Sequence, residues 1–292
     1  MIYNNIAILM TCFNRRELTL SSIKSLYEQE LPPNLFFDIY LVDDDSTDGT
    51  SDTLKQFFPN VKIIKGNGNL FWCGGMRLAW EEAAKGNYDG FLWLNDDTIL
   101  LPQAIYNILN TTITINNKTS KDAIIIGSCL DQTTGVQSYG GRLLKNNKLI
   151  TPLDYPQECE MINGNIVFVP KKIFAEIGNL SADFKHSSGD NDYGLRALKK
   201  GFKLWIAPNY LGYCTFNKEA KGWANPQIPL RQRLNILNSP KGQPFYETFI
   251  FAKRHKGLLW PLDLINLYLL VLFPKSFKNI KEKIKTTFKH ID

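Results

Sequence analysis

Phe91-Leu92-Trp93-Leu94-Asn95-Asp96-Asp97-Thr98 is the most informative segment of the chain. Four bulky apolar residues lead directly into an amide and two adjacent carboxylates. Such an apolar run is typical of a strand buried in a parallel sheet, whereas ionised carboxylates resist burial unless a cation or donors meet them. The pattern therefore predicts a strand that ends at a ligand, a divalent cation beside a nucleotide diphosphate. The alternative is a plain acidic turn after a strand.

Apolar runs and helical spacing alternate on both sides of this stretch. In the first half, strands are expected at 6–10, 38–42 and 61–65, and helices at 15–30, 50–58 and 75–84. The second half is less regular, with strands expected at 123–127, 165–169 and 203–207 and helices at 171–177 and 190–200. This alternation predicts an α/β fold with a mostly parallel, doubly wound sheet and right-handed crossovers.

Three of the expected strands end in unusual polar clusters, at 11–15, 43–46 and 95–98. Ligands of such sheets bind beyond the carboxyl ends of the strands. Three clusters on one edge are a much stronger sign of a nucleotide site than any one of them alone.

The cluster after the second strand continues as Asp43-Asp44-Asp45-Ser46-Thr47-Asp48-Gly49-Thr50. Helix capping accounts for Asp48 and its neighbours. It does not require Asp43 and Asp44, whose carboxylates could accept a pyrimidine N–H or bind ribose hydroxyls.

Two further segments carry candidate chemistry. The segment 66–77 combines four glycines with Trp72 and Arg77; glycines let the backbone approach a ligand, and Arg77 in the first turn of a helix could reach a phosphate. A flexible turn beside a core tryptophan is the alternative. The segment 186–196 contains Asp190, a candidate general base, and Asp192, whose alternative role is a charge at a helix N-terminus.

The composition, with 44% hydrophobic and 21% charged residues, is that of an ordinary folded protein. The formal net charge of +6 does not predict nucleic-acid binding, because six lysines fall in residues 275–292. Five scattered cysteines without a C-x-x-C spacing fit a reducing compartment. No basic and apolar leader is recognisable at residues 1–5, so a cytoplasmic location is expected.

The C-terminal part predicts contact with a membrane surface. Residues 258–273 are strongly apolar but fall short of the roughly 20 residues that span a bilayer. The lysine-rich segment 275–289 has apolar residues at helical spacing, the pattern of an interfacial helix on an anionic membrane. The alternative is a helix packed on the rest of the fold with a solvated basic face.

Taken together, these residues resemble the family 2 glycosyltransferases, which have the nucleotide-sugar-binding GT-A fold. The resemblance covers about 6–214, with the motifs in the same order as in the family. The motifs look most like those of rhamnosyl- and galactofuranosyl-transferring members. It is carried by Thr11-Cys12-Phe13-Asn14-Arg15, the acidic segment 42–50, Asn95-Asp96-Asp97-Thr98 and Gly189-Asp190-Asn191-Asp192-Tyr193-Gly194-Leu195-Arg196.

The resemblance implies roles for individual residues. Thr11 and Asp44 would contact the nucleobase, and Asp43 would support them or reach the ribose. Asp97, at the family's Asp-x-Asp motif, would bind Mg²⁺ or Mn²⁺ bridging the diphosphate. Asp190 would deprotonate the acceptor hydroxyl, which gives inversion at the anomeric carbon. The remaining donor-side residues are Phe13, Asn14, Arg15, Trp72, Arg77, Asn95 and Asp96, and the acceptor-side residues are Asn163, Gly164 and Asp192.

Two positions depart from the family pattern. Asn95 replaces the usual first aspartate. Cys214 follows the last core strand, where many relatives have a histidine, and a thiol is a poor ligand for Mg²⁺. Weak metal binding, or a ligand from elsewhere in the chain, is therefore expected.

The resemblance implies a catalytic domain at 1–215, with a nucleotide-binding half (1–98) and an acceptor half (99–215), followed by a helical, membrane-associating extension at 216–292. The expected function is transfer of a sugar, such as rhamnose or galactofuranose, from a UDP- or dTDP-linked donor to a glycan or lipid-linked acceptor in surface polysaccharide synthesis at the inner face of the cell membrane. A sugar-phosphate nucleotidyltransferase is one alternative, although 11–14 contains no glycine to grip a triphosphate. A non-catalytic nucleotide-binding module is the other. The sequence does not predict an oligomeric state.

Overall fold

The computed structural model describes residues 3–216 and 222–274. The chain forms two compact units. The first consists of Met1–Lys185 and Gly189–Phe216, and the second of His186–Ser188 and Asn217–Asp292.

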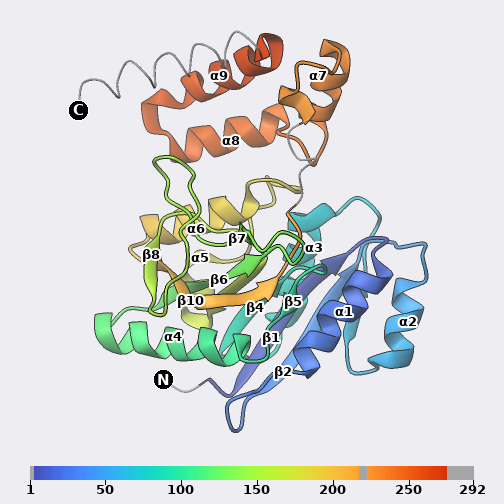
Figure 1. Cartoon of the computed structure of the whole chain (residues 1–292), viewed down its shortest axis with the longest axis vertical. Helices are drawn as coiled ribbons and strands as arrows, with labels where there is room; N and C mark the ends of the chain where they lie inside the picture. Colours follow the sequence, from blue (N-terminus) through green and yellow to red (C-terminus); the bar gives the residue numbers. More distant parts are fainter. Residues whose placement is uncertain (1–2, 217–221, 275–292) are drawn as a thin grey trace. The chain divides into compact units, whose positions relative to one another are not determined.

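The first unit is built on one mixed sheet (Figure 1). Its main order is β3-β2-β1-β4-β9-β6-β10-β5; β7 pairs with β6, and β8 pairs with β10. Strands β3, β2, β1 and β4 are parallel, whereas β9 is antiparallel to both β4 and β6. The strands are β1 (Asn5–Cys12), β2 (Phe36–Asp43), β3 (Lys62–Lys65), β4 (Gly90–Leu94), β5 (Ile99–Leu100), β6 (Ala123–Leu130), β7 (Gln137–Tyr139), β8 (Gln157–Cys159), β9 (Ile166–Pro170) and β10 (Lys203–Tyr213).

Helices cover both faces of this sheet, and the strand sequences show why. In β1, Ile6, Ile8 and Met10 belong to one core cluster, and Ala7 and Leu9 belong to the other. Because side chains alternate along a strand, continuous apolar runs supply two cores at once. The first core packs against α1 (Arg16–Tyr27), α2 (Thr50–Phe57) and α4 (Ala104–Thr119), and the second against α3 (Phe71–Ala83), α5 (Lys171–Ile177) and α6 (Gly189–Lys199).

The predicted α/β class and mostly parallel sheet are confirmed, and every strand and helix expected within 6–207 exists. Two boundaries differ in ways that matter. Helix α3 begins at Phe71 and not at residue 75, so Arg77 lies in its second turn. Strand β10 runs on to Tyr213, beyond Pro208, with register irregularities between Ile206 and Gly212 that absorb the proline.

The second unit, as described, contains helices with a small core of their own. Trp223, Leu237, Leu267 and Val271 form this core. The helices are α7 (Leu230–Asn238), α8 (Phe245–His255), the short η2 (Gly257–Leu259) and α9 (Trp260–Leu272). Among the described residues, no helix combines the length and the apolar character needed to cross a membrane. The predicted interfacial helix at 275–289 lies outside the described residues.

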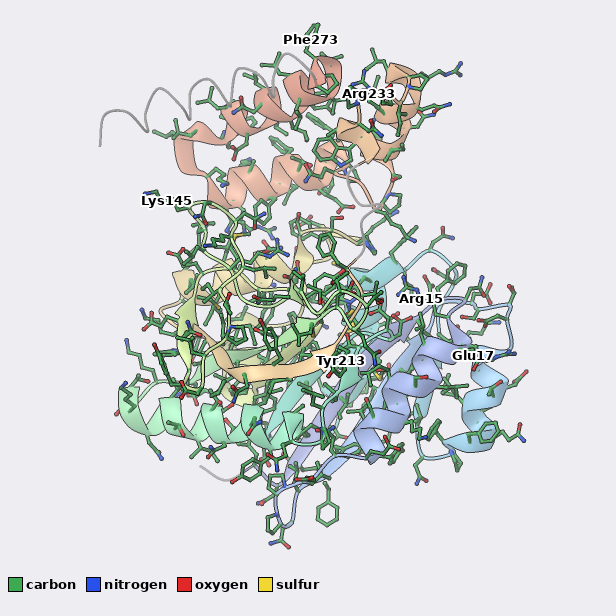
Figure 2. The ribbon with its side chains drawn as sticks, viewed as in Figure 1. Arg15, Glu17, Lys145, Tyr213, Arg233 and Phe273 are labelled. Atoms are coloured by element: carbon green, nitrogen blue, oxygen red, sulfur yellow. The ribbon has the colours of Figure 1, made fainter. Side chains whose placement is uncertain are left out.

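Helix α9 presents a second apolar face. Leu264, Leu267 and Val271 are buried, whereas Leu262, Ile265, Leu269 and Leu272 are 37–53% exposed and follow one another at helical spacing. Leu258 and Leu259 before the helix and Phe273 after it are also exposed. Figure 2 shows Phe273 projecting from the end of α9.

Candidate active site

The three polar clusters predicted at strand ends lie at one edge of the sheet. Strands β1, β2 and β4 are parallel neighbours, with Cys12 opposite Asp43 and Leu9 opposite Trp93. Asn14 joins the first two clusters, because its backbone N–H donates to Ser46 Oγ at 2.9 Å and its Oδ1 accepts from the Thr47 N–H at 2.7 Å. The expectation that the clusters meet is confirmed.

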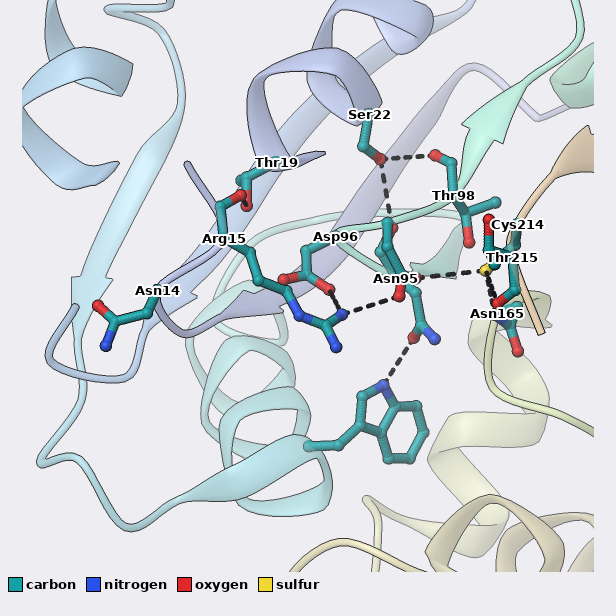
Figure 3. A network of polar contacts seen from close by, with 12 residues as sticks. Asn14, Arg15, Thr19, Ser22, Asn95, Asp96, Thr98, Asn165, Cys214 and Thr215 are labelled. Atoms are coloured by element: carbon teal, nitrogen blue, oxygen red, sulfur yellow. Dashed lines mark hydrogen bonds and ion pairs between the residues drawn. The ribbon is translucent and has the colours of Figure 1, made fainter. Parts of the chain in front are cut away.

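Arg15 connects the first cluster to the third (Figure 3). Its Nη1 donates to Asp97 Oδ2 at 2.8 Å and to Asp96 Oδ1 at 3.2 Å. Burial, together with the charge of Asp97, raises the pKa of Asp96 to about 7, although the Arg15 guanidinium acts in the opposite direction. Two carboxylates are therefore kept close together by one shared cation.

Cys214 contacts the other oxygen of Asp97. Its thiol lies 3.4 Å from Asp97 Oδ1 and accepts from Asn165 Nδ2 at 3.3 Å. Burial, with the charge of Asp97 adding to it, raises the pKa of the Cys214 thiol far above its usual range. The thiol thus stays protonated and donates to the carboxylate, in the place where a histidine was expected from the family pattern.

Asp44 organises the glycine-rich loop. Its Oδ1 accepts the N–H of Gly68 at 2.8 Å, and its Oδ2 accepts the N–H groups of Leu70 at 2.9 Å and Phe71 at 3.0 Å. The last two begin α3, so the carboxylate also caps that helix. Gly66 permits this packing, because a Cβ at that position would lie 2.6 Å from Asp44 Oδ1.

Asp43 shapes the turn that follows β2. Its Oδ1 accepts the Ser46 N–H at 2.9 Å, and its Oδ2 accepts the hydroxyl of Ser51. Both Asp43 and Asp44 are buried, with 4% of their surface exposed. Both carboxylates therefore hold the loops that surround the edge of the sheet.

Trp72 links Asn95, which follows β4, to the candidate base. Its Nε1 donates to Asn95 Oδ1 at 2.7 Å, and Asn95 is thereby fixed in orientation (Figure 3). The indole ring also covers Gly164, where an added Cβ would lie 2.2 Å from the ring. The Gly164 N–H in turn donates to Asp190 Oδ2 at 3.0 Å. The Trp72 indole thus contacts both Asn95 and Gly164, the residue whose N–H donates to Asp190.

Asp190 lies at the start of α6, as its N-terminal acidic pattern predicted. Its Oδ1 accepts the backbone N–H of Asn191 at 2.7 Å and the Asn191 side-chain amide at 3.0 Å. Burial raises the pKa of Asp190, and the backbone N–H groups and the charge of Arg142 partly oppose this. A carboxylate with a raised pKa is a stronger base, which suits proton abstraction from a hydroxyl.

Arg142 was not identified from the sequence. Its Nε and Nη2 donate to Asn163 Oδ1 at 3.0 and 2.6 Å, which anchors the segment before β9. No motif surrounds Arg142, since it lies in an irregular stretch between short strands. The Asn163-Gly164 pair was the only signal in the sequence for this part of the site.

Two predicted residues, Asp192 and Arg77, have structural contacts of their own. Asp192 is fully buried and accepts from Arg196 Nε at 2.9 Å, so its carboxylate faces an ion pair inside the fold. Arg77 donates to the Ser181 carbonyl at 3.4 Å. Thr11 is buried at the end of β1, whereas Phe13 beside it is 51% exposed.

The residues present fit a divalent cation that shares its ligands with a diphosphate. Within 3–216 and 222–274 no group of three or more His, Cys, Asp or Glu side chains could hold a metal alone. Mg²⁺ is commonly bound through one or two carboxylates together with substrate phosphates and water. Asp96 and Asp97 supply that number, and the Arg15 nitrogen between them shows that the pair accepts a positive charge.

Comparisons with known proteins agree with this fold. The profile of the family described as Glycosyl transferase family 2 matches residues 7–163. The chain is 26% identical over 207 residues to the poly(ribitol-phosphate) beta-glucosyltransferase of Bacillus spizizenii, which covers 62% of this chain and 31% of that relative. The chain therefore spans about a third of the length of that curated relative. Its fold is similar, at a TM-score of 0.52 and 13% identity, to a mannosyltransferase from Pyrobaculum calidifontis solved with GDP-Man and Mn²⁺, over 96% of this chain and 83% of that one.

Proposed function

The chain belongs to glycosyl transferase family 2, and from that membership we propose that it is an inverting glycosyltransferase that uses a nucleoside-diphosphate sugar. The observation that carries the proposal is the frame around Trp72. Its indole contacts Asn95, beside the Asp96–Asp97 pair, and Gly164, which donates to Asp190. A leaving-group site and a candidate base are thereby held in one rigid unit.

Asp190 is the proposed base. It takes the proton of the acceptor hydroxyl while that oxygen bonds to the anomeric carbon and the bond from this carbon to the diphosphate breaks. Hydrogen bonds from Gly164 and Asn191 orient the carboxylate, and its raised pKa favours proton acceptance. Attack opposite the leaving group inverts the anomeric configuration.

The donor is proposed to bind along the edge formed by β1, β2 and β4. The nucleoside would lie against Thr11, Phe13, Asn14, Asp43 and Asp44. Arg15, Arg77 and Asn95 would contact the diphosphate or the sugar, and Asp96 and Asp97 would hold Mg²⁺ or Mn²⁺. A divalent cation there would neutralise the charge that develops on the departing diphosphate. Asn163 and Gly164 would face the acceptor, whereas Asp192 is left out because its buried carboxylate pairs with Arg196.

The proposed substrates are a UDP- or dTDP-linked sugar, such as rhamnose or galactofuranose, and a glycan or lipid-linked acceptor in the synthesis of a surface polysaccharide. The names of the two similar proteins add glucose and mannose to the sugars worth testing. The test is a screen of UDP-, dTDP- and GDP-linked sugars, which measures nucleoside diphosphate release with a lipid extract as acceptor, with and without Mn²⁺. We expect acceptor-dependent release with one donor, and no release with any donor would contradict the proposed activity.

We also propose that the second unit contacts the inner face of the cell membrane. The exposed face of α9, formed by Leu262, Ile265, Leu269 and Leu272, is apolar, and six lysines follow it in 275–292. An apolar face flanked by cationic residues suits the interface of an anionic bilayer.

Vesicle sedimentation tests the membrane contact. Replacing Leu262 and Ile265 together by glutamine, or deleting 275–292, should release the protein from vesicles that contain phosphatidylglycerol. Phe57→Gln is the control, because Phe57 is 63% exposed but lies on α2 of the first unit. Unchanged sedimentation of both altered proteins would contradict the contact.

A further inference from the structure

A single nitrogen atom of Arg15 occupies the space between the two carboxylates of the proposed metal site. Nη1 lies 3.2 Å from Asp96 Oδ1 and 2.8 Å from Asp97 Oδ2. A terminal guanidinium nitrogen carries two hydrogens, and here one can point to each carboxylate. The position that would suit a bridging cation is therefore filled by a cation of the chain itself.

Arg15 and a divalent ion exclude each other at this position. Mg²⁺ binds carboxylate oxygens at about 2.0–2.1 Å, well inside the distances that Nη1 now makes. Two cations cannot share the same pair of oxygens at such separations without strong repulsion. For a metal to bind Asp96 and Asp97 together, the guanidinium has to leave.

The surroundings of Arg15 allow it to leave. Its side chain is 40% exposed, and an open depression of about 330 Å³ lies beside it, lined by Asn14, Arg15, Arg16, Glu17, Leu18 and Asp48. Within the described part of the chain, Nε and Nη2 of Arg15 have no hydrogen-bond partner. Among the described residues the guanidinium is thus held through Nη1 alone, which leaves its other donors for phosphate oxygens, for which its shape is suited.

We infer that Arg15 is an exchangeable internal cation, which neutralises Asp96 and Asp97 in the free protein and moves to the diphosphate of the donor when a divalent ion takes its place. The inference rests on the proposed function, since it needs a nucleoside-diphosphate donor. It makes metal and donor binding cooperative: the donor provides a new partner for Arg15, and the released carboxylates bind the metal.

The neighbouring Arg16 provides a matched control. Its Nε pairs with Glu17 at 2.9 Å and its Nη1 donates to the Asp48 carbonyl at 3.1 Å, so its guanidinium does not reach the carboxylate pair. Arg16→Gln and Arg15→Gln remove the same charge from adjacent positions, and only Arg15→Gln removes it from the site. Arg15→Lys keeps the charge and serves as the conservative variant.

The experiment measures two affinities that should change in opposite directions. Mn²⁺ binding to the full chain without nucleotide is followed by electron paramagnetic resonance of the free ion. Arg15→Gln should bind Mn²⁺ roughly fivefold more tightly than the wild type, because no internal cation competes. With saturating Mn²⁺, Arg15→Gln should bind UDP or dTDP roughly tenfold more weakly, because the phosphate partner is missing.

Arg16→Gln should match the wild type in both titrations, and Arg15→Lys should lie between the wild type and Arg15→Gln. A merely structural role of Arg15 would weaken both affinities. Equal or weaker Mn²⁺ binding by Arg15→Gln would overturn the inference. Mn²⁺ binding is measured without a donor sugar. The titration can therefore still be interpreted if the donor screen finds no activity.

Discussion

The indole N–H of Trp72 donates to the side-chain oxygen of Asn95 at 2.7 Å, and this bond fixes which atom Asn95 presents to the site. With Oδ1 facing the indole, Nδ2 is the group left for a ligand. An aspartate at this position would present a second acceptor in its place. The replacement of the family's first aspartate by Asn95 therefore gives a hydrogen-bond donor beside Asp96 and Asp97.

Trp72→Phe should lower kcat/KM for the donor about fivefold, because loss of one hydrogen bond, worth about 1 kcal/mol, frees the Asn95 amide to rotate. Initial rates at low donor concentration measure this. Trp80→Phe is the control, since the Trp80 N–H has no hydrogen-bond partner among the residues that the structure describes. Equal losses in the two variants would show that ring volume, and not the bond to Asn95, matters.

Asp44 should contribute more to stability than Asp45, although the two are adjacent in sequence. Asp44→Asn removes a charge that accepts three backbone N–H groups, so the free energy of unfolding should fall by about 2–3 kcal/mol. Asp45→Asn breaks only an exposed pair with Lys65 at 3.4 Å and should cost less than about 1 kcal/mol. Urea unfolding monitored by tryptophan fluorescence measures both; similar losses would argue against the capping role.

The elements of the fold that the sequence could predict are those with a strong local pattern. Apolar runs such as Ile6–Met10 are unambiguous because they are buried on both faces. Helix α4 was not predicted, because polar residues such as Thr111 and Thr112 lie on its buried side and hide the apolar period. Strands β5, β7 and β8 are two or three residues long and leave no periodic signal.

The sequence predicted which residues form the site better than it predicted the contacts between them. The carboxylates at the strand ends could be placed from the topology alone, since parallel strands end at the same edge. Contacts between distant segments could not: Arg15 with Asp96 and Asp97, Trp72 with Gly164, and Asp192 with Arg196 all depend on side-chain packing. For that reason Asp192 was expected on the acceptor side, whereas its carboxylate lies in a buried ion pair.

Asp190 and Asp192, two residues apart, should therefore respond oppositely to the same substitution. Asp190→Asn should abolish transfer, with a loss of at least about 10³-fold in kcat, while donor binding measured by calorimetry is unchanged. Asp192→Asn removes the carboxylate that pairs with the Arg196 charge and should lower the free energy of unfolding by about 3 kcal/mol, with kcat of the folded protein retained. A wild-type rate in Asp190→Asn would remove that residue from the role of base.

With Mn²⁺ saturating, so that the proposed metal keeps Asp96 ionised, the pH dependence of transfer should show the raised pKa of Asp190. Only the ionised carboxylate can accept the acceptor proton, so kcat should fall as the pH falls through the pKa of Asp190. Burial raises the pKa of Asp190, so the fall in kcat should occur at a pH above about 4, the pKa of an ordinary carboxyl group. Rates at saturating donor are measured between pH 4 and pH 9. The profile is defined when the rates extend roughly two pH units on each side of its midpoint.

The raised pKa of Asp190 also makes the stability of the fold depend on pH. The dependence is opposite in sign to that of a carboxylate whose pKa is lowered by an ion pair. Because folding raises the pKa of Asp190, the folded state binds the proton of this carboxyl group more tightly than the unfolded state does. The stability that this proton contributes is fully present below the pKa of the unfolded chain, about 4, and is lost as the pH rises through the pKa of the folded chain. At pH 8 the wild type therefore holds a poorly solvated charge that Asp190→Asn lacks. The asparagine variant should melt at a higher temperature than the wild type at pH 8, and the gap should narrow as the pH is lowered toward 4. A gap that stays constant with pH would show that Asp190 titrates alike in the folded and unfolded chains.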